Sequence, residues 1–547
     1  MVFRLHKLGD INANYSWVTA CLAHFQLVLY VDDIFVDFPM FKKLLLPFIA
    51  FSLSHSLSLT AEESVPVAVS SLAQSTADYA SATYQQAMTE SLAQLVSFNT
   101  VAVEGLPSPE NPVHQGFKQE LARQADQLGL DFSDYGYVVV IGLGQSDERL
   151  GLITHGDVQP ADPSKWLKSP FELDATSEPG ILLARGAEDD KGPISTAMYA
   201  MKAIKDKEIS LKRRIELYVY MAEESDWAPL EAFVKTHPMP QLNITIDANY
   251  PVVTAEKGYG TVKMTFPNKV LNSDKPYIKS FSGGFFTSQI PEDAQAIIAH
   301  ANSNLLEKII TQAAKQKGMK YSYDWHEDEL MITALGKSTH SSEPQHGKNA
   351  IAHLAALLSD RHWPNNASGA LVNFINTHLG TGIYGELFGK IAFKDAFMGP
   401  MTVAPTVLTQ KDHGIELSIN LRQPRGKTLE QLTEEINQTL IQWQQKNQVN
   451  LLNIDVDISE PFVQTDAPQV PTLLAVFAHY TGIKDAQPIS IGAGTNSRLF
   501  PTAVVFGPAM PGKPYTGHSE HEFVSVEQFV LNLKMYTAAM VELAGEP

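Results

Sequence analysis

The chain has 547 residues, of which 44% are hydrophobic and 18% charged, so it can bury a large core and is long enough for more than one domain. This balance excludes a disordered, collagen-like or small disulfide-stapled protein. Lysine and arginine total 41 against 60 aspartates and glutamates, and the net charge of −19 argues against a nucleic-acid partner. The single cysteine, Cys21, can form no internal disulfide.

Residues 40–61 have the pattern of a signal peptide. Two lysines follow Met40, an apolar stretch at 44–53 is too short to cross a bilayer, and small residues precede Glu62. We therefore expect translation to start at Met40, residues 1–39 to be a non-native upstream extension, and the mature protein to be exported, to the periplasm in a bacterium. The alternative is an amphipathic N-terminal helix in a cytoplasmic protein.

The chain then alternates helical and strand patterns. We predict helices at 82–97, 112–128 and 195–205, the last following Pro193, and strands at 137–143, 150–154, 181–183, 215–221 and 244–246. Strands that alternate with helices indicate an α/β sheet with parallel stretches.

The pattern changes at Gly258 to an α+β type and changes back near Pro461. Within this insertion we predict helices near 304–317, 348–359 and 428–446 and strands near 403–409 and 415–421. After it we predict a helix at 471–481, a strand at 502–506 and a closing helix at 525–544. The simplest division is a catalytic domain formed by residues 80–257 and 461–547, interrupted by an inserted domain at 258–460.

Potential metal ligands follow four of the predicted strands, at the edge where open α/β sheets bind ligands. They are His155 and Asp157 after 150–154, Asp189 and Asp190 after 181–183, Glu223 and Glu224 after 215–221, and Asp247 after 244–246. A fifth element, GHSEHE at 517–522, carries His518 just before the last helix, from which it can return to the same edge.

The chemistry of these residues suits a dinuclear hydrolytic site. Carboxylates and imidazoles without a thiolate fit zinc, cobalt or manganese, and two neighbouring dications need a bridging carboxylate. Of the adjacent Glu223 and Glu224, one can bind metal while the other reaches a metal-bound water as the base. Asp157 can fix the tautomer of His155. Taken singly, each of these motifs is more often a surface turn.

The order of the motifs resembles the M20 metallopeptidases. The motifs are HGDVQPA, RGAEDDKGP, AEES, DANYP and HSEHE, and the resemblance covers roughly residues 80–547. The DDKGP motif, the EKG at 256–258 and the long insertion favour the dipeptidase branch, with its PepV-like and carnosinase-like enzymes, over the deacylase branches. The resemblance implies an α/β catalytic domain with a mixed, largely parallel sheet, interrupted by an inserted α+β lid domain.

The resemblance also implies two Zn²⁺ ions per chain, with Co²⁺ or Mn²⁺ as alternatives. Five side chains would hold them, namely His155 and Asp247 on one metal, Glu224 and His518 on the other, and Asp189 as the bridge. Glu223 would be the general base that activates a metal-bridging water, with Asp157 beside His155. In relatives the peptide bond after the bridging aspartate is cis, which predicts a cis bond between Asp189 and Asp190.

Further matches concern the substrate. His340, in GKSTHSSEP of the inserted domain, matches a histidine that hydrogen-bonds the developing oxyanion. Arg422 matches an arginine that holds the C-terminal carboxylate of the substrate. In the loop GAGTNSR, Thr495 and the backbone of Gly494 are expected to contact the substrate. Many relatives have an asparagine where this chain has Ser288, so its substrate preference is expected to differ from that of PepV-like enzymes.

These features together predict hydrolysis of dipeptides, with small peptides as partners and no stable membrane insertion after processing. The alternatives are an N-acyl-amino-acid hydrolase or a carboxypeptidase on the same site. A non-catalytic binding protein of this fold is disfavoured, because Glu223 and Asp189 are both present. PepV-like enzymes are monomers and carnosinase-type relatives dimerise through the insertion, so a monomer and a homodimer both stay open.

Overall fold

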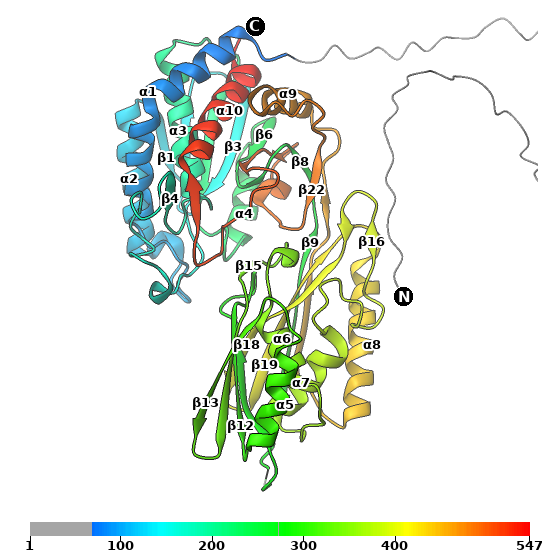
Figure 1. Ribbon diagram of the computed structural model, residues 1–547. Coiled ribbons are helices and arrows are strands. Elements are labelled where there is room, and N and C mark those ends of the chain that lie inside the picture. The colour runs from blue at the N-terminus through cyan, green and yellow to red at the C-terminus, as the bar shows by residue number, and fades with distance from the viewer. Residues whose placement is uncertain (1–67, 272, 547) are drawn as a thin grey trace, which may run out of the picture. The chain divides into compact units, whose positions relative to one another are not determined.

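The computed structural model describes residues 68–271 and 273–546. Its first sheet is mixed and has nine strands (Figure 1). In spatial order they are β1 (Asp131–Asp134), β2 (Val138–Leu143), β5 (Arg214–Tyr220), β3 (Arg149–His155), β6 (Leu242–Thr245), β23 (Val504–Val505), β8 (Val253–Glu256) and β21 (Phe462–Val463), with β22 (Ile489–Ile491) paired to β8. The central pairs β5–β3, β3–β6 and β6–β23 are parallel, and β1–β2, β2–β5, β23–β8 and β21–β8 are antiparallel. The predicted α/β fold on a mixed sheet is confirmed.

Helices cover both faces of this sheet. They are α1 (Ser71–Val96), α2 (Pro112–Leu128), α3 (Lys191–Asp206), α4 (Ala228–Thr236), α9 (Val470–Thr481) and α10 (Val526–Ala544). Along β5, Leu217 and Val219 join the large core beneath α1, α3 and α10, whereas Tyr218 packs with Phe233 of α4 on the opposite face. Figure 1 shows α1 in blue beside α10 in red, and these two helices pack against each other.

Two helices illustrate what the sequence pattern predicts well and badly. The helix predicted at 112–128 is confirmed: the side chain of Asn111 caps its first turn and Gly129, at φ 66°, ends it. The helix predicted at 82–97 begins earlier, at Ser71. The missed turns bury Ala73, Ala77 and Ala80 rather than large apolar residues, so their helical period is weak in the sequence.

One strand lies outside the sheet for which it was predicted. Strand β4 (Ile181–Leu183) pairs with β25 (Phe523–Ser525) in a separate two-stranded sheet. The expectation that Asp189 follows a strand of the main sheet is therefore wrong. Asp189 instead lies in the loop that leads from β4 into α3. A second short pair joins β7 (Ala248–Asn249) to β24 (Pro508–Ala509).

The insertion forms a second sheet of eight antiparallel strands, which we call the lid sheet. In order they are β13 (Lys320–His326), β14 (Glu329–Leu335), β12 (Asp293–Ala299), β10 (Tyr277–Gly283), β18 (Thr402–Lys411), β19 (Gly414–Gln423), β9 (Gly258–Pro267) and β20 (Leu452–Ile458). Short pairs join β11 (Gln289–Ile290) to β15 (Thr339–His340) and β16 (Lys394–Asp395) to β17 (Gly399–Pro400). The predicted inserted α+β part is confirmed.

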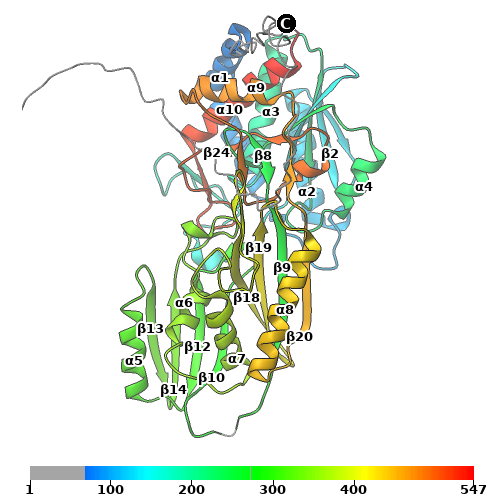
Figure 2. The ribbon, with the colours of Figure 1, turned by 90° about the vertical axis from the view of Figure 1, so that its right-hand side faces the viewer.

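Four helices pack on the lid sheet (Figure 2). They are α5 (Ser303–Ala313), α6 (Ala350–Leu357), α7 (Ala367–Phe374) and α8 (Leu429–Asn447). Burial alternates along β12 and β14, as expected for a sheet covered on one face. The chain enters this sheet at Gly258 and returns to the first sheet at Phe462. The division into domains at 257/258 and 460/461 stays a prediction, because the described residues belong to one compact unit.

In the part of the chain that the structure describes, no helix has both the length and the apolar character that a membrane span requires. The predicted signal peptide at 40–61, the upstream segment 1–39 and Cys21 lie outside the described residues.

Candidate active site

Three parallel strands of the first sheet end at one edge. His155 is the last residue of β3 and pairs in the ladder with Tyr220, the last residue of β5. Glu223 and Glu224 follow in the turn after β5, and Asp247 comes two residues after β6. Because β3, β5 and β6 run parallel, these side chains meet at their carboxyl ends, as the sequence pattern predicts.

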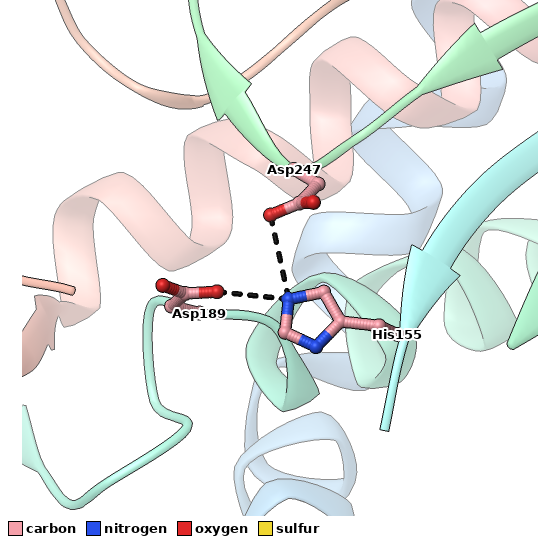
Figure 3. A group of neighbouring side chains, drawn as sticks. All are labelled: His155, Asp189 and Asp247. Carbon is pink, nitrogen blue, oxygen red and sulfur yellow. Dashed lines mark hydrogen bonds and ion pairs between the residues drawn. The ribbon is translucent and has the colours of Figure 1, made fainter. Parts of the chain in front are cut away.

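Asp189 completes one group with His155 and Asp247 (Figure 3). Nε2 of His155 lies 2.9 Å from Oδ1 of Asp189 and 3.5 Å from Oδ1 of Asp247. The peptide bond between Asp189 and Asp190 is cis, which confirms that prediction. His155 and Asp189 are both buried, so the group lies inside the protein.

His518 reaches the other oxygen of Asp189. Its Nε2 lies 3.1 Å from Oδ2 of Asp189 and 2.8 Å from Oε1 of Glu224. The two oxygens of Asp189 therefore each face a different histidine, which is the arrangement that a carboxylate bridging two cations needs.

Asp157 orders the groups on either side of it. Nδ1 of His155 lies 3.0 Å from its backbone oxygen and 3.5 Å from its carboxylate, which leaves Nε2 as the ligand atom. The same carboxylate accepts the backbone N–H groups of Glu223 and Glu224, each at 3.0 Å. Asp157 thus fixes both the histidine and the turn that carries the two glutamates.

The donor set fits two divalent cations. Ligand atoms lie within 4.8 Å of one another in three groups: His155, Asp189 and Asp247; Asp189, Glu224 and His518; and His155, Glu223 and Glu224. The first two groups share Asp189. Among the described residues, no lysine or arginine pairs with these carboxylates. Burial opposes a charged His518, yet Glu224 and Asp189 raise its pKa to about 10, so the surroundings favour positive charge at this point.

Glu223 belongs only to the third group, which lacks Asp189, and it has no ion-pair partner in the described chain. Its place in the protein interior, together with the nearby charge of Asp247, raises the pKa of its carboxyl well above the usual value. A carboxylate with a raised pKa is a better proton acceptor, which suits a general base.

The lid contributes two further buried side chains, those of His340 and Arg422. Ser342 donates its backbone N–H to Nδ1 of His340 at 3.2 Å, and its hydroxyl lies 2.5 Å from the same atom. Burial and the charges of His518 and Arg422 hold the pKa of His340 well below its usual range. Arg422 donates to Asn420 and Ser341, and its guanidinium lies 4.9 Å from the ring centre of Tyr259.

One cavity of about 550 Å³ is lined by the lid residues His340 and Arg422 and by the candidate ligands and base except His155, namely Asp189, Glu223, Glu224, Asp247 and His518. His155 and Asp157 lie deeper in the protein. Gly494 and Thr495 line it as well. The hydroxyl of Thr495 donates to Glu256 at 2.5 Å, and its backbone N–H donates to the same carboxylate at 3.1 Å. The side chain of Thr495 is therefore engaged with Glu256 inside the protein, and its expected contact with a substrate stays a prediction.

Three residues that contact the candidate metal ligands or their backbone were given no role from the sequence. Tyr515 donates its hydroxyl to Oδ2 of Asp189 at 2.6 Å, and Gln159 donates to Oε2 of Glu224 at 2.8 Å. Glu522 accepts the backbone N–H of Asp189 at 3.0 Å and pairs with buried Arg185 at 2.7 Å. Gln159 and Glu522 stand within the motifs HGDVQPA and HSEHE, so their place in these motifs is the signal that could have identified them.

Ser288 lies beside the candidate metal ligand His518. Its hydroxyl is 3.1 Å from Nδ1 of His518, and the neighbouring Gln289 donates to the backbone oxygen of His518 at 2.9 Å. A lid residue therefore helps to orient one of the candidate ligands.

Known proteins match this chain in sequence and in fold. It is 28% identical to the Beta-Ala-Xaa dipeptidase of Lactobacillus delbrueckii subsp. lactis over 469 residues, which cover 84% of this chain and 97% of that protein. It is also 28% identical to the putative dipeptidase YtjP of Bacillus subtilis, over 82% of this chain and 96% of the relative. The structure of human carnosine dipeptidase 1 covers 86% of this chain and 99% of its own, with a TM-score of 0.51 and 15% identity.

The model of Peptidase family M20/M25/M40 matches residues 151–542, a range that contains every candidate metal ligand named above. The two-part fold, the clustered carboxylates and histidines and this match agree with one another. The chain belongs to peptidase family M20/M25/M40 and is a metallopeptidase.

Proposed function

We propose that this metallopeptidase hydrolyses dipeptides with two zinc ions. The proposal rests on the position of Asp189 between two histidines. Its Oδ1 lies 2.9 Å from Nε2 of His155, and its Oδ2 lies 3.1 Å from Nε2 of His518. The sequence relatives named as dipeptidases support the choice of substrate class.

The chain supplies a complete ligand set for two ions. His155 and Asp247 would hold one, Glu224 and His518 the other, and Asp189 both. When bound, the ions would polarise the scissile carbonyl and lower the pKa of a water molecule. Carboxylates and imidazoles suit zinc, and Co²⁺ or Mn²⁺ would also fit.

Glu223 serves as the general base. It is next in sequence to Glu224 and lines the same cavity, so it can accept a proton from the attacking water and later deliver it to the leaving nitrogen. The Asp157 carboxylate holds the backbone of both glutamates, so the base and the ligand keep a fixed separation.

His340 stabilises the oxyanion. The backbone N–H of Ser342 points at Nδ1, so the proton of the neutral ring resides on Nε2. The lowered pKa keeps the ring neutral near pH 7. His340 therefore presents an N–H donor to the cavity, as a developing negative charge on the carbonyl oxygen requires.

Arg422 holds the C-terminal carboxylate of the substrate. Its guanidinium is buried, and among the described residues it has hydrogen bonds only to the neutral Asn420 and Ser341. A fixed anchor near the metal groups limits how many residues follow the scissile bond, and a cavity of about 550 Å³ suits a short peptide.

A substrate panel tests this function. The zinc-loaded protein is compared on Ala-Ala, N-acetyl-alanine and Ala-Ala-Ala, and we expect Ala-Ala to have the highest kcat/KM, by about tenfold or more. Fastest turnover of N-acetyl-alanine would identify an acyl-amino-acid hydrolase instead, and fastest turnover of the tripeptide would identify a peptidase for longer chains. A chelator should abolish the activity and added zinc should restore it.

We propose further that the enzyme is exported, on the strength of the signal-peptide pattern at 40–61. N-terminal sequencing of the native protein should find a start near Glu62. A start within residues 1–39 would contradict export by this signal.

A further inference from the structure

A second arginine, Arg498, lines the cavity beside Arg422. Its contacts are long: Nη2 is 3.4 Å from Oε2 of Glu256 and 3.5 Å from the backbone oxygen of Lys257, and Nη1 is 3.4 Å from the backbone oxygen of Glu460. Its Nε is buried and has no hydrogen-bond partner among the described residues. Charge-assisted hydrogen bonds of a guanidinium are normally about 2.7–2.9 Å long, so Arg498 has donor capacity that these contacts do not use.

Positive charge is in excess at this end of the cavity. Of Arg422, Arg498 and the buried Lys257, only Arg498 pairs with a carboxylate, that of the buried Glu256, which already accepts two hydrogen bonds from Thr495. The ammonium group of Lys257 donates to the backbone oxygen of Pro400. Burial and the charge of Arg498 lower the pKa of Arg422 to about 10, and burial and Arg422 lower the pKa of Lys257. Arg422 is thus close enough to both Arg498 and Lys257 for their charges to repel its own. One substrate carboxylate would balance only one of the two surplus charges.

The neighbouring loop leaves Arg498 accessible. Gly494 lines the cavity, and a side-chain carbon at this position would lie 3.5 Å from Nη2 of Arg498. The glycine therefore keeps the space in front of the guanidinium free. Trp227, whose ring centre is 5.9 Å from Cζ of Arg498, also lines the cavity.

We propose that Arg498 binds a second carboxylate of the substrate, so that the enzyme prefers dipeptides whose C-terminal residue is aspartate or glutamate. This inference rests on the proposed function, in which Arg422 takes the C-terminal carboxylate. The acidic side chain of the same residue then meets Arg498, because the two guanidinium groups are neighbours. A neutral side chain would leave one positive charge at this end of the cavity unbalanced.

The test compares Ala-Glu with Ala-Gln, which have nearly the same shape and differ in one charge. We expect kcat/KM to be about tenfold or more higher for Ala-Glu, since a hydrogen bond to a charged group typically contributes this much. Equal values for the two, with both hydrolysed, would overturn the preference and leave the dipeptidase function standing. Failure to hydrolyse these two and Ala-Ala would overturn the proposed function itself.

Variants assign the preference to Arg498. Because removal of Arg498 alone would leave Glu256 buried without its ion partner, the double variant Arg498→Met/Glu256→Gln removes both charges. We expect its Ala-Glu to Ala-Gln ratio to fall to about one. Arg361→Met, which removes an exposed arginine of the lid, should keep the wild-type ratio. An unchanged ratio in the double variant would overturn the assignment.

A measurement on the wild-type enzyme does not depend on the folding of any variant. Free glutamate and free glutamine are the corresponding product amino acids, and we expect glutamate to inhibit Ala-Ala hydrolysis at about tenfold or more lower concentration. Equal inhibition constants would contradict a second carboxylate site.

Discussion

Two histidines on opposite walls of the cavity have opposite environments. The ring centres of His518, near the edge of the first sheet, and His340, in the lid, are 4.8 Å apart. Burial disfavours the charged form of both, but Glu224 and Asp189 raise the pKa of His518 to about 10. For His340, burial and the charges of His518 and Arg422 lower the pKa well below the usual value.

The difference separates two tasks. The wall formed by the first sheet gathers carboxylates and therefore attracts cations, which suits activation of water and of the scissile carbonyl. The lid wall offers a neutral N–H donor and a buried guanidinium, which suit negative charge on the substrate. Variants on each wall should therefore fail in different ways.

The largest effect is expected on the first wall. Glu223→Gln removes the base and keeps the shape of the side chain, so kcat should fall by about 10²–10⁴-fold while the zinc content stays near that of the wild type. Single-turnover kinetics and metal analysis measure the two quantities. Glu434→Gln is the matched control, because Glu434 is an exposed residue of α8, and it should leave kcat unchanged. A rate near that of the wild type would remove Glu223 from the role of base.

The second largest fall in kcat is expected from a substitution in the lid. His340→Ala removes the oxyanion donor, and kcat should fall by about 10²–10³-fold, with no loss of metal. His362→Ala, an exposed lid histidine, should have no effect on kcat. If His340→Ala instead lost zinc, His340 would belong with the ligands and the division between the two walls would fail.

Arg422→Met should weaken recognition rather than chemistry. We expect kcat/KM for Ala-Ala to fall by about 10–100-fold, since a buried charge-assisted contact is lost. The wild-type enzyme should lose a similar factor when the C-terminus of the substrate is amidated, whereas the variant should treat the acid and the amide alike. A variant that still discriminates between them would place the carboxylate site elsewhere.

Ser288→Ala tests whether the lid wall contributes to zinc binding on the wall formed by the first sheet. The hydroxyl lies 3.1 Å from Nδ1 of His518, so its loss should weaken binding of one zinc ion by about tenfold, at the low end for a residue that orients a ligand. Competition with a chelating dye measures the affinity. Unchanged affinity would show that the lid does not help to hold the metal.

The sequence predicts the side chains that stand at strand ends. His155, Glu223 and Asp247 follow buried apolar runs, so their meeting at one edge follows from parallel pairing of β3, β5 and β6. Asp189 reaches the same place by another route. Its preceding strand pairs with β25, and the position of the loop depends on contacts such as that with Glu522, which no local pattern encodes.

The contacts across the cavity could not be predicted from the sequence. Ser288 meets His518 across 230 residues of chain, and Tyr515 meets Asp189 across 326. The Ser288–His518 pair depends on how the inserted part packs against the first sheet, and the Tyr515–Asp189 pair depends on how the residues before and after the insertion fold together. The excess of positive charge around Arg498 likewise appears only once Lys257 and Arg422 are known to be its neighbours.

The central claim is that two cations lie side by side, with Asp189 between them. A crystal structure of the zinc-loaded enzyme, with anomalous data collected on both sides of the zinc absorption edge, tests it most directly. We predict two anomalous peaks, one coordinated by His155 and Asp247 and one by Glu224 and His518, with one oxygen of Asp189 on each. A single peak, or peaks that Asp189 does not contact, would contradict the account.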